Sequence, residues 1–131
     1  WRAVAAYRAA MQAAGLPARH LPGDFTAAGG SAATATVLSR WPDTDAVLAS
    51  SDAMALGAIA ALRKRSFDVP GDVAVAGFDD IPFAALSTPA LTTASHPVDR
   101  IATGAATAIL ERTGAPPATF YATELIHRDS A

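Results

Sequence analysis

The chain has 131 residues, of which 51% are hydrophobic and 17% are charged, and it carries a formal net charge of −2 and no cysteine. This length and composition predict one folded domain with its own core and exclude a disordered tail. The acidic balance argues against nucleic-acid binding by this segment. The absence of cysteine excludes disulfides and thiolate metal sites. No apolar run reaches membrane-spanning length, so no contact with a membrane is expected.

Hydrophobic periodicity and turn residues predict an alternation of helices and strands. In chain order the predicted elements are helix 2–14, strand 19–21, helix 31–41, strand 45–50, helix 53–65, strand 73–77, a helical turn at 81–86, strand 89–94, helix 99–112 and strand 119–128. Alternation on this scale predicts an α/β fold with three layers, in which helices cover both faces of a mostly parallel sheet.

The strand at 73–77 leads directly into polar residues. It is apolar up to Gly77, and Phe78, Asp79 and Asp80 follow. Ligands of open α/β sheets bind at the carboxyl ends of the strands, so a carboxylate here is a candidate ligand contact. Adjacent side chains diverge, which makes the two carboxylates a poor acid/base pair. From the residues alone, a ligand contact and a solvated turn cap both remain open for Asp79, and Asp80 reads as the cap of the residues from Ile81 onward.

Four segments together resemble the LacI family of bacterial transcription regulators. They are Ser51-Asp-Ala-Met-Ala-Leu-Gly-Ala58, Val69-Pro-Gly-Asp-Val-Ala-Val-Ala-Gly-Phe-Asp-Asp-Ile-Pro82, Thr88-Pro-Ala-Leu-Thr-Thr93 and Glu124-Leu-Ile-His-Arg-Asp-Ser130. The resemblance implies a lobe of the periplasmic-binding-protein type I fold. Residues 1–94 and 117–131 are expected to form the C-terminal lobe, and the helix at 98–114 to belong to the N-terminal lobe. A helix-turn-helix DNA-binding domain is expected upstream, outside this chain.

The resemblance also implies effector-binding residues. Asp79 matches a carboxylate that accepts hydrogen bonds from ligand hydroxyls, and Phe25 matches an aromatic that packs on the ligand. Ser51 stands where many members have an asparagine, and His96 where glutamine is common. From the residues alone, Ser51 reads as a helix cap and Phe25 as a residue packing onto the next helix, so both alternatives stay open.

This sequence departs from the family pattern in its first helix. An arginine that reaches the ligand is often found there, three residues before a glycine, but Ala3 and Ala6 occupy those positions. Either Arg2 makes the contact from the neighbouring position or the protein does not use it, which disfavours a carboxylate-bearing effector. Ser66 replaces the glycine that usually ends the helix before the Val-Pro motif.

The sequence offers no catalytic, metal or cofactor motif. His20, His96 and His127 lie on separate elements without metal-ligand spacing. No nucleophile elbow, dinucleotide fingerprint or phosphate-binding loop is present, so an enzyme is not expected. The cluster Arg63-Lys64-Arg65 is explained by its position in the last turn of a helix.

The resemblance implies a cytoplasmic repressor that senses a small-molecule effector, usually a sugar, and binds operator DNA through the upstream domain. A homodimer is expected, with Met54, Leu56, Ala85 and Leu86 at its interface. The alternative is a periplasmic sugar-binding protein of a transporter, which shares the fold. The apolar face of helix 99–113 is expected to pack against a neighbouring copy.

Overall fold

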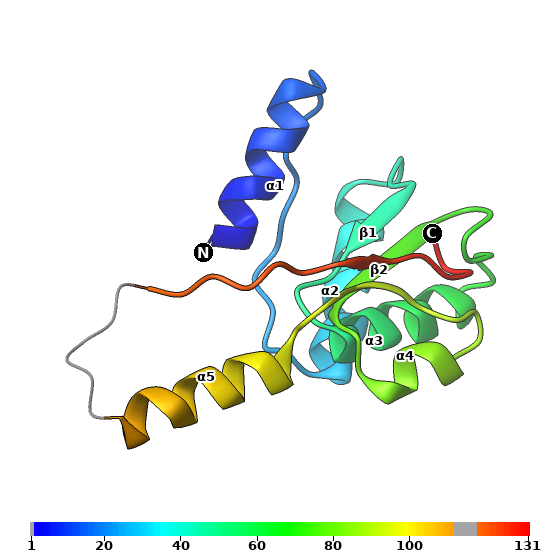
Figure 1. Cartoon of the computed structure of the whole chain (residues 1–131). Coiled ribbons are helices and arrows are strands. Elements are labelled where there is room, and N and C mark those ends of the chain that lie inside the picture. The colour runs from blue at the N-terminus through cyan, green and yellow to red at the C-terminus, as the bar shows by residue number, and fades with distance from the viewer. Residues whose placement is uncertain (1, 112–117) are drawn as a thin grey trace.

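The structure is a computed structural model that describes residues 2–111 and 118–131. Its elements are α1 (Arg2–Ala13), α2 (Ala27–Arg40), β1 (Ala46–Leu48), α3 (Asp52–Arg63), β2 (Ala74–Asp79), α4 (Pro82–Leu86), β3 (Thr92–Ser95), α5 (Val98–Leu110) and β4 (Leu125–Ile126). Figure 1 shows a sheet with helices packed below it and with α1 and α5 projecting from it.

The four strands form one sheet in the order β1-β2-β3-β4. β1, β2 and β3 run parallel, and β4 pairs antiparallel with β3. The predicted α/β class with a mostly parallel sheet is therefore confirmed. The parallel order brings the carboxyl ends of β1, β2 and β3 to the same edge, which is the edge where we expect the ligand.

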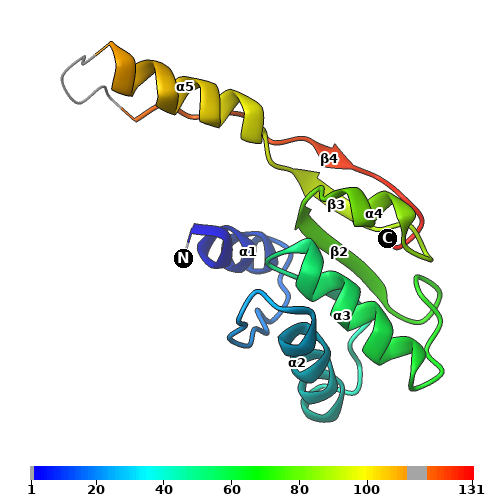
Figure 2. The same cartoon turned by 90° about the horizontal axis from the view of Figure 1, so that it is seen from below.

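The core lies between the sheet and α3. Val73 and Val75 are fully buried, as are Leu62 on α3 and Leu91 before β3. α3 is apolar around most of its circumference because it packs on the sheet on one side and on α2 on the other. Figure 2 shows α3 lying between α2 and the strands, with its N-terminal end beside the carboxyl end of β2.

α2 begins four residues before the predicted helix 31–41, so that prediction was wrong at its start. Thr26 caps the helix by accepting a hydrogen bond from Gly29 N at 2.9 Å. Gly29 and Gly30, which we expected in a loop, lie inside it. A side chain at Gly30 would collide with the Met54 backbone, so this glycine serves the close approach of α2 to α3 rather than a turn.

The predicted strand 19–21 is absent from the structure. Both backbone groups of Arg19 are used by Tyr7 of α1, whose hydroxyl donates to Arg19 O at 3.1 Å and accepts from Arg19 N at 3.2 Å. The extended segment therefore bonds to a helix side chain instead of a neighbouring strand. α1 itself ends as predicted, since Gly15 has φ +71° and Leu16 N donates to Met11 O at 2.9 Å.

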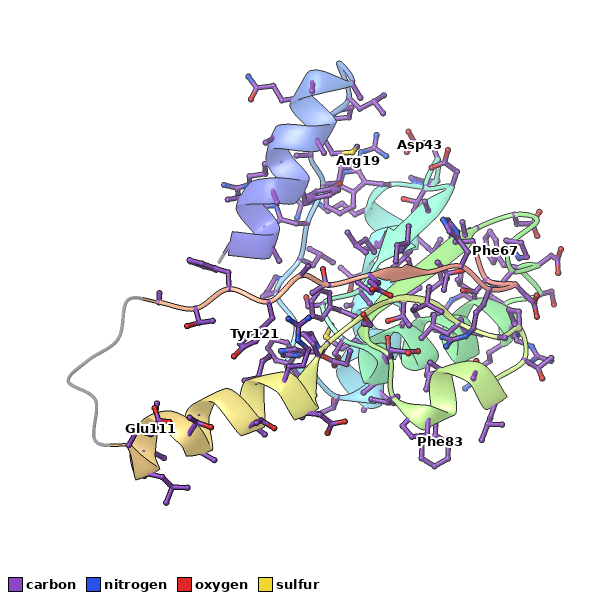
Figure 3. All side chains as sticks on the ribbon, viewed as in Figure 1. Arg19, Asp43, Phe67, Phe83, Glu111 and Tyr121 are labelled. Carbon is purple, nitrogen blue, oxygen red and sulfur yellow. The ribbon has the colours of Figure 1, made fainter. Side chains whose placement is uncertain are left out.

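α5 stands apart from the sheet in both views (Figures 1 and 2), and none of its residues is buried. The following arm, residues 118–124, returns alongside it. Tyr121 points toward α5 in Figure 3, and the Arg100 guanidinium lies 5.2 Å from the centre of its ring. The predicted strand 119–128 was too long, because only Leu125 and Ile126 pair with β3. The end of this helix, predicted at Gly114, and the extended segment predicted at Pro116-Pro117 lie outside the described residues.

Candidate functional site

The carboxyl end of β2 carries Asp79 in an unusual backbone conformation. Asp79 has φ +118° and Asp80 has φ +57°, so two successive residues lie where residues with side chains are uncommon. The turn directs the Asp79 carboxylate toward His96, with Oδ1 3.8 Å from His96 Nδ1. Both side chains are about two-fifths exposed, at 39% and 44%. Phe78 lies beside them and meets the His96 ring edge-on, with ring centres 5.9 Å apart.

The surroundings of Asp79 oppose its ionisation. Partial burial raises the pKa of the Asp79 carboxyl above its usual value, and the negative charge of Asp52 raises it further. His96 acts in the opposite direction and offsets part of the rise. A carboxylate held in this way gains from hydrogen-bond donors that approach it from a ligand.

Asp80 does not cap α4, which corrects the role expected from the sequence. The N-cap residue of α4 is Ile81, and no side chain bonds the cap. Asp80 Oδ1 instead lies 2.7 Å from the Arg128 guanidinium, which also donates to Leu91 O at 2.8 Å. The Asp80 side chain thus ties the turn after β2 to the chain just beyond β4.

Asp52, at the start of α3, also holds the turn that carries Asp79 and Asp80. Its side chain is fully buried at the start of α3, where Oδ1 accepts a hydrogen bond from Thr93 Oγ1 at 2.5 Å and Oδ2 accepts one from Ile81 N at 2.9 Å. Gly77 of β2 lies against Oδ1, and any side chain at that position would collide with the carboxylate. Asp52 therefore joins α3, β3 and the turn that carries Asp79.

Ser51 and Phe25 occupy two neighbouring loops. Ser51 is 5% exposed and caps α3 by accepting from Met54 N at 3.3 Å, as one alternative predicted. A hydroxyl that accepts in this way can still donate its own hydrogen to a ligand. Phe25 is 67% exposed, so it does not pack onto α2, and the alternative of a packed residue was wrong. Its φ is +62°.

The loop around Phe25 is held by its own hydrogen bonds. Asp24 Oδ1 accepts from Thr26 N at 3.0 Å and from Thr26 Oγ1 at 2.9 Å. These bonds lower the pKa of Asp24 below its usual value because they stabilise the ionised carboxyl. The bonds therefore link the residues on either side of Phe25, whose ring is exposed to solvent.

A hollow of about 300 Å³ lies beside the Asp79–His96 pair. It is lined mainly by aromatic, threonine and proline side chains from β2, the start of α5 and the returning arm: Phe78, His96, Pro97, Ile101, Thr119, Phe120, Tyr121 and Thr123. A larger hollow of about 490 Å³ lies between α2 and the end of α3, but alanines and the basic Lys64 and Arg65 dominate its walls. Only the first hollow combines aromatic rings with the polar end of β2.

Comparison with known proteins agrees with this architecture. The family model described as a periplasmic binding protein-like domain matches residues 2–131. The chain belongs to this family. It is 46% identical over 94 residues to the HTH-type transcriptional regulator MalR of Streptomyces coelicolor, covering 72% of this chain and 27% of MalR. It is 40% identical over 113 residues to the ribose operon repressor of Escherichia coli, covering 84% of this chain and 34% of the repressor.

Solved structures of LacI-family regulators share the fold. The complex of the transcriptional regulator CelR with cellobiose superposes with a TM-score of 0.85 at 37% identity, covering 95% of this chain and 40% of that one. The predicted resemblance to LacI-family regulators is thus confirmed. The chain spans about a third or less of the length of the two curated relatives.

The four residues predicted at a dimer interface differ in exposure within this periplasmic binding protein-like domain. Leu86 is 77% exposed and Ala85 is also exposed, both on α4. Phe83 on the same helix is 68% exposed, and Figure 3 shows its ring pointing away from the fold. Leu56 is half-buried. Met54 is 7% exposed and packs against Gly23 and Gly30, so its side chain offers a partner little surface.

Residues 2–111 and 118–131 contain no group of three or more histidine, aspartate or glutamate side chains that could hold a metal ion. No helix within these ranges is long and apolar enough to cross a membrane. For Arg2, the proposed substitute for the family's ligand-binding arginine, the structure describes the backbone and not the side chain.

The sequence did not single out Asp52 and Thr93 as functional. Asp52 follows Ser51 at the start of a predicted helix and reads as a helix cap, because nothing local distinguishes a solvated cap from a buried carboxylate. The available signal was the pair Thr92-Thr93, two hydroxyls in an otherwise apolar strand. Buried hydroxyls need hydrogen-bond partners, so such a pair predicts a polar partner on a neighbouring element.

Proposed function

We propose that this chain is part of the effector-sensing region of a transcriptional repressor and that its effector is an uncharged sugar. The regulators and repressors that the chain resembles support the regulatory role. The observation that supports a sugar as the effector is the half-exposed Asp79 carboxylate, which lies beside His96 and an aromatic-lined hollow.

The chemistry of these groups suits a polyol. A carboxylate accepts two hydrogen bonds from hydroxyls, and its charge strengthens both. Aromatic faces such as that of Phe25 cover the apolar C–H face of a sugar ring. The negative charges of Asp79 and Asp52 would repel a phosphate or carboxylate, which favours a neutral ligand.

We infer that the sugar lies between two lobes and that this chain supplies one wall. Residues 1–94 and 117–131 are assigned to the C-terminal lobe and the helix at 98–114 to the other lobe. The projecting position of α5, with no buried residue, supports this division. A ligand between lobes stabilises the closed arrangement only if it binds that arrangement more tightly than the open one.

The exposed residues of α4 support a homodimer. Phe83 and Leu86 present two large apolar side chains to solvent from one short helix, and Ala85 lies between them. We assign this surface, together with Leu56, to a contact between copies. A dimer transmits lobe closure to two upstream DNA-binding domains, which act on operator DNA in the cytoplasm.

A periplasmic sugar-binding protein is the second candidate, because it shares the fold and the site. The relatives named as HTH-type regulators favour the repressor. We assign no catalytic role to Asp79 or His96, since the site is accounted for by sugar binding.

The test is a thermal-shift screen of the full-length protein against neutral mono- and disaccharides, sugar phosphates and sugar acids. A bound ligand stabilises the folded state by RT ln(1 + [L]/Kd), so at the same ligand concentration a tighter ligand gives the larger rise in melting temperature. We expect a neutral sugar to give the largest rise and to change operator binding in a gel-shift assay. A rise with sugar phosphates alone would contradict the proposed ligand class.

A further inference from the structure

The buried carboxylate of Asp52 fixes the turn that carries Asp79. Its two oxygens have different partners, Thr93 Oγ1 on one side and the backbone N–H of Ile81 on the other. Ile81 follows Asp79 and Asp80, the two residues with positive φ. The carboxylate therefore holds the far end of a strained two-residue turn, while β2 holds its near end.

The hydrogen bond that Asp52 accepts from the turn does not by itself require a negatively charged side chain. It is 0% exposed, and no arginine, lysine or histidine of the described residues forms an ion pair with it. Its position in the first turn of α3 gives it the favourable end of the helix dipole. An amide at this position would accept the Ile81 N–H equally well, so the hydrogen bond alone does not explain a carboxylate.

We propose that Asp52 is a positioning residue for the effector site, which holds the turn that carries Asp79 through the Ile81 N–H and places a buried carboxylate next to that turn. This role rests on the proposed function, in which Asp79 accepts hydrogen bonds from sugar hydroxyls. Asp52 itself does not contact the sugar.

The charged groups near Asp79 come from different elements of the fold. Asp52 approaches from α3, and His96 approaches from the segment after β3. Asp80 is adjacent in the chain, but its charge is paired with Arg128 at 2.7 Å. Of these groups, only Asp52 combines a negative charge that acts on Asp79 with a hydrogen bond to the turn.

Two substitutions of Asp52 test its hydrogen bond to Ile81 N and its charge separately. Asp52→Asn keeps an acceptor for Ile81 N and removes the charge, whereas Asp52→Ala removes both. Asp45→Asn is the control, because Asp45 is an exposed carboxylate at the opposite end of β1. The measurements, on the full-length protein, are the carboxyl titration of Asp79 and the amide exchange of Ile81 by NMR, and the affinity for the neutral sugar that stabilises the protein most.

In Asp52→Asn the Asp79 carboxyl is expected to titrate at lower pH than in the wild type, while the Ile81 amide exchanges at nearly the same rate. In Asp52→Ala the Ile81 amide is expected to exchange at least about tenfold faster and the sugar to bind roughly tenfold more weakly. Asp45→Asn is expected to change none of the three. A purely structural Asp52 would leave the Asp79 titration unmoved.

The outcomes separate this inference from the proposed function. An unchanged Asp79 titration and Ile81 exchange in both Asp52 variants would overturn the positioning role. If both change as expected while Asp79→Asn leaves sugar binding untouched, Asp52 still positions Asp79, and the proposed function is the part that fails.

Discussion

Arg128 places one guanidinium nitrogen 2.7 Å from Asp80 Oδ1 and the other 2.8 Å from Leu91 O. The two side chains are only 18% and 30% exposed. This pair fastens the chain beyond β4 to the turn that follows Asp79. A second arginine–aspartate pair, Arg19 with Asp43, has the same 2.7 Å distance but is more exposed, at 32% and 70%, and Figure 3 shows the two residues beside each other between α1 and β1.

The two pairs make a matched test of burial. Replacing Arg128 by Met is expected to lower the free energy of unfolding by about 2 kcal/mol, because it leaves Asp80 and the Leu91 carbonyl without a donor. Replacing Arg19 by Met is expected to change it little, since exposed ion pairs contribute little. Urea denaturation of both variants measures the difference. Equal effects would refute the structural role of the half-buried Arg128–Asp80 pair.

Ser66 is expected to be a site where glycine stabilises the protein. Its φ is +63°, and Phe67 N donates to Leu62 O at 3.1 Å and Ser66 N to Arg63 O at 3.0 Å, which closes α3 as glycine usually does. Ser66→Gly removes the steric cost of a side chain in the left-handed conformation and should raise the free energy of unfolding by about 1 kcal/mol. Ser39→Gly within α2 is the control and should lower stability by roughly 0.5 kcal/mol. Calorimetry distinguishes the two signs.

Asp79→Asn is expected to stabilise the protein at neutral pH. The folded state raises the pKa of Asp79, so its ionisation destabilises the fold at pH values above that raised pKa. Below the ordinary pKa of aspartate the carboxyl is protonated in both states and the cost disappears. The gain should therefore be present at pH 7 and fade toward pH 4. Because the side chain is 39% exposed, solvent screening limits the gain to less than about 1 kcal/mol.

The measurement is the melting temperature of the wild type and of Asp79→Asn across this pH range, with Asp45→Asn as the exposed control. A variant that is less stable than the wild type at pH 7 would show that Asp79 contributes to the fold through contacts rather than opposing it through its charge.

The α4 surface is tested by introducing a charge. Leu86→Lys should reduce the dimer fraction, because a lysine replaces an apolar side chain that is 77% exposed and so costs the isolated fold little. Leu56→Lys is expected to act in the same direction, but Leu56 is half-buried against the core, so stability must be measured beside it. Sedimentation velocity reports the dimer fraction, and Leu16→Lys, 55% exposed after α1, is the control. An unchanged dimer in Leu86→Lys would remove α4 from the interface.

Much of the fold was predictable because its signals are local. The apolar run ending at Gly77-Phe78 predicted β2, and the cap at Ser51 predicted the start of α3 to within one residue. The failures came where a distant partner decided the structure. The segment 19–21 has the composition of a strand, but Tyr7 takes its backbone hydrogen bonds. Gly29 and Gly30 read as a loop because the approach of Met54 is not visible in the local sequence.

The candidate site was predictable only in part for the same reason. Asp79 could be chosen because it follows a buried strand at a sheet edge and also matches a carboxylate of the LacI-family pattern. The partners of Asp80 and Asp52 could not be predicted, because Arg128 lies 48 residues from Asp80 and Thr93 lies 41 residues from Asp52. Pairings at such separations carry no local pattern.

The central claim is that Asp79 binds a neutral sugar, and calorimetric titration of the full-length protein tests it most directly. The sugar selected by the thermal-shift screen is titrated into the wild type, Asp79→Asn and Asp45→Asn. We predict that Asp79→Asn weakens binding by about tenfold or more, since a charge-assisted hydrogen bond is lost, while Asp45→Asn binds like the wild type. Equal affinity of Asp79→Asn and the wild type would contradict the account.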